Sequence, residues 1–278
     1  MEIGTLYICP TPIGNLDDIT IRTLNILKEV DLIAAEDTRH TVRLLNHFEI
    51  KKPLFSYHEH NKIEKGPVLI NRLLQGENIA LVSDAGMPGI SDPGEDLIRL
   101  AIESEIEVVG LPGASASVLA LIVSGLPTGQ FVFEGFLPKK KTDRKNRLEF
   151  LNKEQRTLIF YEAPHRLKAF LKETHGAMGD RRVALCRELT KKYEEKLRMT
   201  LSQAIDYYEE NQPRGEYVII MEGNSIEICD ENPTENLSIV ESVQYYMDQD
   251  LSKKDAIKKV AKERKVNKNE IYQEVLDL

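Results

Sequence analysis

Short apolar runs alternate with amphipathic segments through the first 125 residues, and this alternation constrains the fold more than any other feature. Five runs have the β-branched and apolar composition of strands: TLYICP, DLIAAE, PLFSYH, NIALVS and EVVGLP. Apolar residues recur at helical spacing between them, around residues 19–27, 69–74 and 97–101. Strict alternation of strand and helix predicts an α/β fold with a mainly parallel sheet and helices on both faces.

The pattern changes at SGLPTGQ (124–130), where two glycines and a proline indicate a hinge. Beyond it, five further runs are typical of strands: FVFEGFLP, TLIFYEA, RVALCREL, EKLRMTL and EYVIIMEG. Helices are predicted around 142–153, 165–176 and 201–211. Because some of these strands follow each other closely, we expect a second α/β domain whose mixed sheet includes antiparallel pairing.

The last part of the chain has a different character. NSIEICDENPTEN (224–236) is acidic, polar and contains a proline, which indicates a linker. Short helical patterns follow, two of them introduced by the capping sequences SKKD and NKNE. The predicted organisation is therefore an N-terminal α/β domain (1–125), a second α/β domain (126–223), a linker (224–236) and a small helix-turn-helix tail (237–278).

Composition excludes several classes of protein. The formal net charge of -8 argues against indiscriminate nucleic-acid binding, although local patches can override it. Cys9, Cys186 and Cys229 are far apart, which predicts neither a disulfide framework nor a zinc site and fits a reducing cytoplasm. The longest apolar stretch, ASVLALIVSGL, is too short for a bilayer span, so we expect no export and no membrane insertion.

Residues of unusual composition fall where the strands of the first domain end. These loops are PTPIGNLDD (10–18), EDTRH (36–40), SDAGMPGISDPG (83–94) and PGASAS (112–117). In an open parallel sheet, ligands bind at the carboxyl ends of the strands, so four such loops together predict a binding cleft. Any one of them alone is equally consistent with a turn that carries an N-cap aspartate.

The loops also restrict the ligand. None matches a phosphate-binding G-x-x-x-x-G-K-[ST] or a dinucleotide-binding G-x-G-x-x-G, which disfavours nucleoside triphosphates and NAD. Asp84 can accept hydrogen bonds from an amine or ribose, while Gly86 and Gly89 permit close approach of a flat ligand. An adenosine joined to an amino acid through a cationic sulfur suits this site. Asp92, which precedes Pro93, is predicted to cap the next helix.

Six motifs in order, TPIGNLDDIT, AEDTRHT, SDAGMPGISDPG, PGASA, GFLPKK and YEAPHR, closely resemble the ribosomal RNA small subunit methyltransferase I family of the tetrapyrrole methylase superfamily. The resemblance runs from about residue 5 to 223, and the helical tail is also similar. It implies a homodimeric enzyme that binds S-adenosylmethionine between two domains. The implied reaction is methylation of the ribose 2'-hydroxyl of a cytidine in the decoding region of small-subunit (16S) ribosomal RNA, within the small subunit.

Matching the motifs position by position assigns the cofactor contacts. The resemblance implies contacts from Ile13, Asp84, Gly86, Ile90, Ser115 and Ala116, and from Tyr161, Leu189 and Tyr217 in the second domain.

A ribose hydroxyl also needs a group that accepts its proton. Glu36 and His165 are the candidate bases, with Arg39 as a clamp on an RNA phosphate or an aid to deprotonation. Each has a structural alternative, because Glu36 with Asp37, or His165 after Pro164, can simply begin a helix. The pair His58 and His60 has no obvious third ligand, so a solvated loop is favoured there and no metal is predicted.

Two basic segments stand out in this acidic chain. KKKTDRKNR (139–147) carries six basic residues and one acid, and residues 253–268 carry eight against two. Lysine runs are most often solvated faces, but a position beside the cleft favours phosphate contacts. Lys139, Lys140 and Lys141, together with Arg166 of YEAPHR, are therefore predicted to bind RNA.

Two other functions remain open from the sequence. A tetrapyrrole C-methyltransferase, acting on a precorrin or uroporphyrinogen, would use the same cofactor site but neither basic segment. A non-enzymatic RNA-binding assembly factor would retain the cleft without binding the cofactor.

Overall fold

The computed structural model describes residues 2–224, 234, 237–249, 251–264 and 266–275. The chain forms two compact units, Met1–Ser225 and Ile226–Leu278. Cys229, Leu276 and most of the predicted linker lie outside the described residues. No helix within the described ranges is long and apolar enough to cross a membrane.

The first sheet is wholly parallel, as predicted from the alternation. Its strands are β1 (Leu6–Ile8), β2 (Leu32–Ala35), β3 (Leu54–Ser56), β4 (Ile79–Val82) and β5 (Val108–Gly110), in the order β3-β2-β4-β1-β5. Connections run through the short 3-10 helix η1 (Leu16–Asp18), α1 (Ile21–Glu29), α2 (Thr38–His47), α3 (Lys62–Leu74) and α4 (Glu95–Glu103). For α2, the sequence offered only Glu36 and Asp37 as residues that could begin a helix, because its buried stripe is only Thr41, Leu44 and Leu45.

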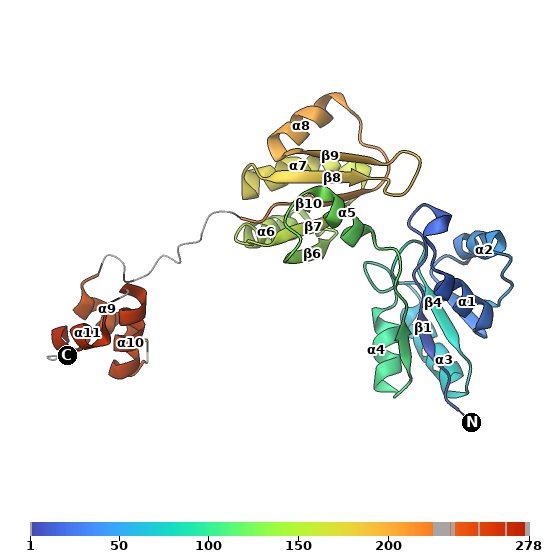
Figure 1. Ribbon diagram of the computed structural model, residues 1–278, viewed down its shortest axis with the longest axis horizontal. Helices are drawn as coiled ribbons and strands as arrows, with labels where there is room; N and C mark the ends of the chain where they lie inside the picture. Colours follow the sequence, from blue (N-terminus) through green and yellow to red (C-terminus); the bar gives the residue numbers. More distant parts are fainter. Residues whose placement is uncertain (1, 225–233, 235–236, 250, 265, 276–278) are drawn as a thin grey trace. The chain divides into compact units, whose positions relative to one another are not determined.

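Helices cover both faces of this sheet (Figure 1). Leu69, Leu73 and Leu97 of α3 and α4 pack with Leu6 and the other strand side chains on one face. Side chains of α1 and α2 pack with those strand residues that point the other way. Alternate residues of each buried strand thus enter two cores, which explains why the strands are almost continuously apolar.

The second sheet is mixed. It contains β6 (Phe131–Gly135), β7 (Thr157–Glu162), β8 (Arg182–Arg187), β9 (Glu195–Thr200) and β10 (Tyr217–Met221), in the order β6-β7-β10-β8-β9. β6 and β7 are parallel and the other pairs are antiparallel, which confirms the predicted mixture.

Helices also cover both faces of the second sheet. The helices α6 (Lys141–Leu151), α7 (Pro164–Met178) and α8 (Leu201–Glu210) pack on one face. The other face is covered by α5 (Ala116–Ser124), which follows β5 of the first sheet. This helix therefore places the PGASA loop, at the end of the first sheet, directly beside the second sheet.

In the part of the second unit that the structure describes, three helices form a bundle: α9 (Ile239–Met247), α10 (Lys253–Arg264) and α11 (Lys268–Glu274). Its core contains Val243, Tyr246, Val260 and Ile271. The Ser238 hydroxyl caps α9 in a capping box, and the Ser252 hydroxyl accepts a hydrogen bond from the Asp255 amide at 3.2 Å, as the SKKD pattern predicts. The α/β fold with a small helical tail is confirmed.

Candidate active site

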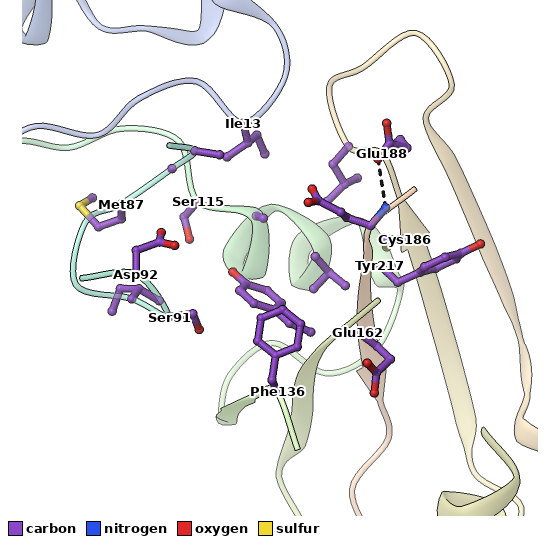
Figure 2. Close-up of a pocket in the computed structure, with 18 of the residues that line it drawn as sticks. Ile13, Met87, Ser91, Asp92, Ser115, Phe136, Glu162, Cys186, Glu188 and Tyr217 are labelled. Carbon is purple, nitrogen blue, oxygen red and sulfur yellow. Dashed lines mark hydrogen bonds between the residues drawn. The ribbon is translucent and has the colours of Figure 1, made fainter. Parts of the chain in front are cut away.

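A cavity of about 270 Å³ lies within the first unit, lined by loops of the first sheet and by strand ends of the second (Figure 2). We call it the Tyr161 cavity. The first sheet contributes Ile13 and the loop 85–92, and the start of α5 contributes Ser115 and Ala116. The second sheet contributes Phe136, residues 161–163, Cys186, Glu188, Leu189, Lys191 and residues 216–218.

The glycine-rich loop after β4 is fixed to the loop after β1. Thr11 and Gly86 exchange two backbone hydrogen bonds of 2.9 and 3.0 Å, and the Ser83 hydroxyl donates to the Gly86 carbonyl at 3.0 Å. Gly86 has φ +82°, and a Cβ there would lie 3.2 Å from Cγ2 of Ile13. A glycine is therefore required both by the left-handed backbone and by the close packing of the two loops.

Aromatic rings form another wall of the cavity. Tyr161 makes edge-to-face contacts with Phe133 and Phe136, at centroid distances of 5.2 and 5.6 Å. Phe136 is 54% exposed, although it is large and apolar. An exposed ring on the rim of a concave site offers a surface for a flat ligand.

A group of carboxylates lies beside the cavity, on the side of the first sheet. Asp84 lies at the end of β4, and its Oδ1 accepts a hydrogen bond from the Asp37 amide at 3.1 Å, which ties the β2 and β4 loops together. Burial, and then the charge of Asp84, raise the pKa of Glu36. The cluster thus carries negative charge in a partly desolvated setting.

The prediction that Asp92 caps a helix is wrong. Helix α4 begins at Glu95, and its N-cap is Gly94, whose φ of +150° is accessible to glycine. Asp92 instead lines the Tyr161 cavity, with its carboxylate directed inward (Figure 2). Burial, and then the charges of Glu36, Asp84 and Glu216, raise the pKa of Asp92 to about 7.

The loop after β8 closes the other side of the cavity. The Thr190 hydroxyl accepts a hydrogen bond from the Asn15 amide at 3.1 Å, which joins this loop to the one after β1. Glu188 and Thr190 have φ of +50° and +66°, unusual values for residues with side chains. The Lys191 ammonium group lies 3.2 Å from Glu188 and 3.5 Å from Glu216. Left-handed backbone at residues such as Glu188 and Thr190 is typical of loops that are held in place for function.

The structure brings most of the predicted cofactor residues to one place. All of them except Asp84 line the Tyr161 cavity: Ile13, Gly86, Ile90, Ser115, Ala116, Tyr161, Leu189 and Tyr217. The Tyr217 ring packs in the core, where the Tyr208 hydroxyl donates to the Tyr217 hydroxyl at 3.3 Å. Asp84 lines a second, adjoining cavity.

The predicted catalytic residues are not gathered around the Tyr161 cavity. Asp37 caps α2 and binds the Arg39 guanidinium, with Nη2 to Oδ2 at 2.7 Å, so Arg39 has a carboxylate partner on the surface. His165 is the exposed second residue of α7. Glu36 is half-buried, within electrostatic range of Asp84 but outside the cavity lining. Their catalytic roles remain predictions.

The predicted RNA-binding residues differ in their surroundings. Lys139, Lys140 and Lys141 are exposed at the start of α6. Arg166 is held by Glu162, with Nε to Oε1 at 3.4 Å, and by the Leu137 carbonyl at 3.2 Å. Two arginines of the same basic segment have structural partners, namely Arg144 with Glu173 and Arg147 with Glu134.

Several cavity residues were not predicted from the sequence: Met87, Ser91, Asp92, Phe136, Glu162, Ala163, Cys186, Glu188, Lys191, Glu216 and Val218. Most lie inside or beside the motifs GFLP, YEAP, CREL and GEYVII. The sequence signal that could have identified them is therefore their position next to a strand end. This signal is as clear for the strands of the second sheet as for those of the first.

Comparison with known proteins agrees with this architecture. A family model described as Tetrapyrrole (Corrin/Porphyrin) Methylases matches residues 5–205. A solved cobalt precorrin-4 methyltransferase superposes with TM-score 0.58 at 19% identity, over 78% of this chain and 94% of that one. A solved diphthine synthase gives TM-score 0.60 at 13% identity, over 79% and 90%. Fold and cavity together define a methylase of the tetrapyrrole methylase class.

Relatives of higher sequence identity identify the family within this class. Ribosomal RNA small subunit methyltransferase I of Halalkalibacterium halodurans is 52% identical over 97% of this chain and 93% of the relative. The Bacillus subtilis protein of the same name is 50% identical over 98% and 94%. The chain belongs to the ribosomal RNA small subunit methyltransferase I family.

Proposed function

We propose that this protein transfers a methyl group from S-adenosylmethionine to the ribose 2'-hydroxyl of a cytidine in the decoding region of small-subunit ribosomal RNA. Relatives about half identical along nearly the whole chain are named for a methyltransferase of that RNA. The observation that carries the proposal is the Tyr161 cavity, which combines aromatic walls, close glycine backbone and carboxylates.

The residues present fit S-adenosylmethionine. Tyr161 and Phe136 provide a surface for its adenine, and Gly86 leaves room for the ligand against the loop backbone. The excess negative charge around Asp92 suits a sulfonium cation, since burial and like charges already disfavour an ionised Asp92. At the start of α5, the side chain of the N-cap residue Ser115 makes no capping hydrogen bond, and Ser115 and Ala116 line the cavity, so the positive end of this helix suits a ligand carboxylate.

The bound cofactor supplies an electrophilic methyl group on a cationic sulfur. The residues of the chain hold the acceptor hydroxyl in line and accept its proton. Alignment of two reactants can contribute about 7 to 11 kcal/mol to lowering a barrier. The loops that carry Ile13 and Leu189 line the cavity from opposite sheets and hold the space in which the two reactants meet.

We propose Asp92 as the group that accepts the proton, in place of the exposed His165. Asp92 lines the cavity with its carboxylate directed inward, and its pKa of about 7 is matched to general-base catalysis near neutral pH. Glu36 then acts at longer range, because its charge contributes to the raised pKa of Asp92.

RNA contacts are assigned to the exposed lysines 139–141, which follow the cavity residue Phe136 by only a few positions. The tail contributes further positive charge, with Lys253, Lys254, Lys258 and Lys259 on α10. Contacts of this kind bind the RNA backbone without reading its sequence. The folded structure of the small ribosomal subunit then determines which nucleotide is methylated.

A homodimer in the cytoplasm is also proposed. Val118 and Ile122 of α5 are 44% and 66% exposed although they are apolar, which supports burial against a second copy. Light scattering of the purified protein measures this directly, and a monomer at micromolar concentration would contradict it.

A tetrapyrrole C-methyltransferase is the alternative. Its support is the fold, shared at 13–19% identity with solved structures that include precorrin and uroporphyrin methyltransferases. Incubation with labelled S-adenosylmethionine and either uroporphyrinogen or unmethylated small subunits separates the two functions. Label in the RNA supports our proposal, and label only in the tetrapyrrole contradicts it. If calorimetry detects no binding of millimolar S-adenosylmethionine, both enzyme functions are excluded in favour of an assembly factor.

A further inference from the structure

A second cavity, of about 630 Å³, adjoins the first. We call it the Arg43 cavity. It is lined by the loop after β1, by one side of α2 and by the start of the loop after β4, and it shares Ile13, Ala85, Lys191 and Glu216 with the Tyr161 cavity. The wall between the two cavities therefore consists of residues that reach both.

The floor of the Arg43 cavity is polar but its hydroxyls are already bonded. Thr11, Thr41 and Ser83 are buried there. Their hydroxyls donate to the carbonyls of Ser83, Asp37 and Gly86, at 3.1, 3.2 and 3.0 Å. The shape of this floor is thus fixed before any ligand arrives.

Two side chains of α2 that line the cavity are available, by contrast. The exposed side chains of His40 and Arg43 form no ion pair or hydrogen bond with the other described residues. Arg39, on the same helix, is already bound to Asp37 by paired hydrogen bonds of 3.0 and 2.7 Å. Arg43 is therefore better placed than Arg39 to bind a phosphate at this cavity. Lys191, on the shared wall, is already paired with Glu188 and Glu216.

The dimensions of the cavity limit what can enter. A reacting oxygen must come within about 3 to 3.5 Å of the methyl carbon, which lies inside the first unit if the Tyr161 cavity holds the donor. A paired RNA helix is far wider than a cavity of about 630 Å³ and carries its 2'-hydroxyls in a shallow groove. A single nucleotide turned out of the helix has the required size, and enzymes that act on nucleotides within a helix commonly extrude them.

We propose that the Arg43 cavity receives one nucleotide extruded from the RNA, with Arg43 and His40 on its flanking phosphate and its ribose at the wall shared with the Tyr161 cavity. This inference rests on the proposed function. It assigns the acceptor a site separate from that of the donor, so the two sites can be blocked independently.

The first test fills the cavity. Leu16 lines the Arg43 cavity and is 37% exposed, so Leu16→Trp obstructs the site without disturbing a buried core. Ile21→Trp is the matched control, because Ile21 is 78% exposed on α1 and lies outside both cavities. Calorimetry measures the Kd for S-adenosylmethionine, and single-turnover transfer of labelled methyl to unmethylated small subunits measures the reaction.

We expect Leu16→Trp to lower transfer at least 100-fold, to change the Kd for S-adenosylmethionine less than twofold, and Ile21→Trp to behave as wild type. Transfer by Leu16→Trp at the wild-type rate would overturn the assignment. So would loss of cofactor binding, since the cavity would then belong to the donor. Wild-type protein that binds the cofactor but methylates no subunits would instead contradict the proposed function, and the acceptor site with it.

The second test removes one charge. Arg43→Gln should raise the KM for subunits several-fold and reduce the slope of log affinity against log salt by about 0.7 to 0.9, the change for one phosphate contact. Arg22→Gln, on the exposed surface of α1, is the control. Equal salt slopes for wild type and Arg43→Gln would show that Arg43 makes no phosphate contact, and would overturn its role.

Discussion

Replacing Asp92 by asparagine should stabilise the protein at alkaline pH while it impairs methyl transfer. The carboxylate lies among Glu36, Asp84 and Glu216, and it forms no ion pair with the other described residues. Its pKa in the folded protein, about 7, is above the ordinary value of 3.8. Below pH 3.8 the group is protonated in both states and has no effect on stability. As pH rises from about 4 to 7, the unfolded chain ionises more readily, so the free energy of unfolding falls.

The size of this effect follows from the shift in pKa. A difference of about three pH units, at 1.36 kcal/mol per unit, sets an upper limit of about 4 kcal/mol above pH 7. Because Asp92 is partly exposed, solvent screening reduces the expected value to about 1 to 2 kcal/mol. Asparagine has nearly the same shape and no charge, so Asp92→Asn should recover this amount at pH 8 and less at pH 5.

Urea unfolding of both proteins at pH 5, 6.5 and 8 measures the difference. The control is Asp96→Asn, because hydrogen bonding to Lys62 lowers the pKa of Asp96, and loss of that carboxylate should destabilise the protein at pH 8. Transfer by Asp92→Asn should fall by about 10² to 10⁴, as expected when a general base is removed. If Asp92→Asn were no more stable than wild type at pH 8 and had the same dependence on pH, the argument about crowded charges would be wrong.

Four further results are expected. Affinity for S-adenosylmethionine, measured by calorimetry, should rise between pH 6 and 8 as Asp92 ionises. S-adenosylhomocysteine lacks the sulfonium charge, so its affinity should depend less on pH. Equal dependence of the two affinities on pH would contradict a contact between Asp92 and the sulfonium. Gly86→Ala, at φ +82°, should lower stability by about 1 to 2 kcal/mol in thermal unfolding, whereas the helical Gly176→Ala should raise it; the reverse order would refute the backbone argument. Alanine at lysines 139–141 should weaken binding to subunits and flatten its salt dependence in filter binding, and unchanged binding across salt would make the lysines a solvated face. Deletion of residues 226–278 should leave cofactor binding intact in calorimetry, because that unit has its own core. The deletion should weaken methyl transfer to subunits, and loss of cofactor binding would contradict the independence of the two units.

The sequence was most informative where structure is local. Buried parallel strands are continuously apolar, so the runs around Ala34 and Leu81 could be recognised without any knowledge of their neighbours. The cap residues Ser252 and Asn267 mark the starts of two tail helices for the same reason. The loops that follow the first sheet were also identified, because parallel strands bring their carboxyl ends to one edge.

The parts that could not be predicted depend on contacts between distant residues. Asp92 precedes a proline and resembles a cap, but the turn at Gly94 delays the helix and leaves the carboxylate in the cavity. Its raised pKa arises from Glu36, Asp84 and Glu216, which no local pattern connects. Likewise, Arg144 looked like part of an RNA-binding segment, although its partner Glu173 lies on another helix.

The most direct test of the central claim is the position of the transferred methyl group. Unmethylated small ribosomal subunits are incubated with the protein and S-adenosylmethionine labelled in the methyl group, and the RNA is then digested and its nucleosides separated. We predict label on the ribose 2'-oxygen of one cytidine in the decoding region, and none with Asp92→Asn over the same period. Label on a carbon or nitrogen of a base, or no label in the RNA, would contradict the proposed reaction.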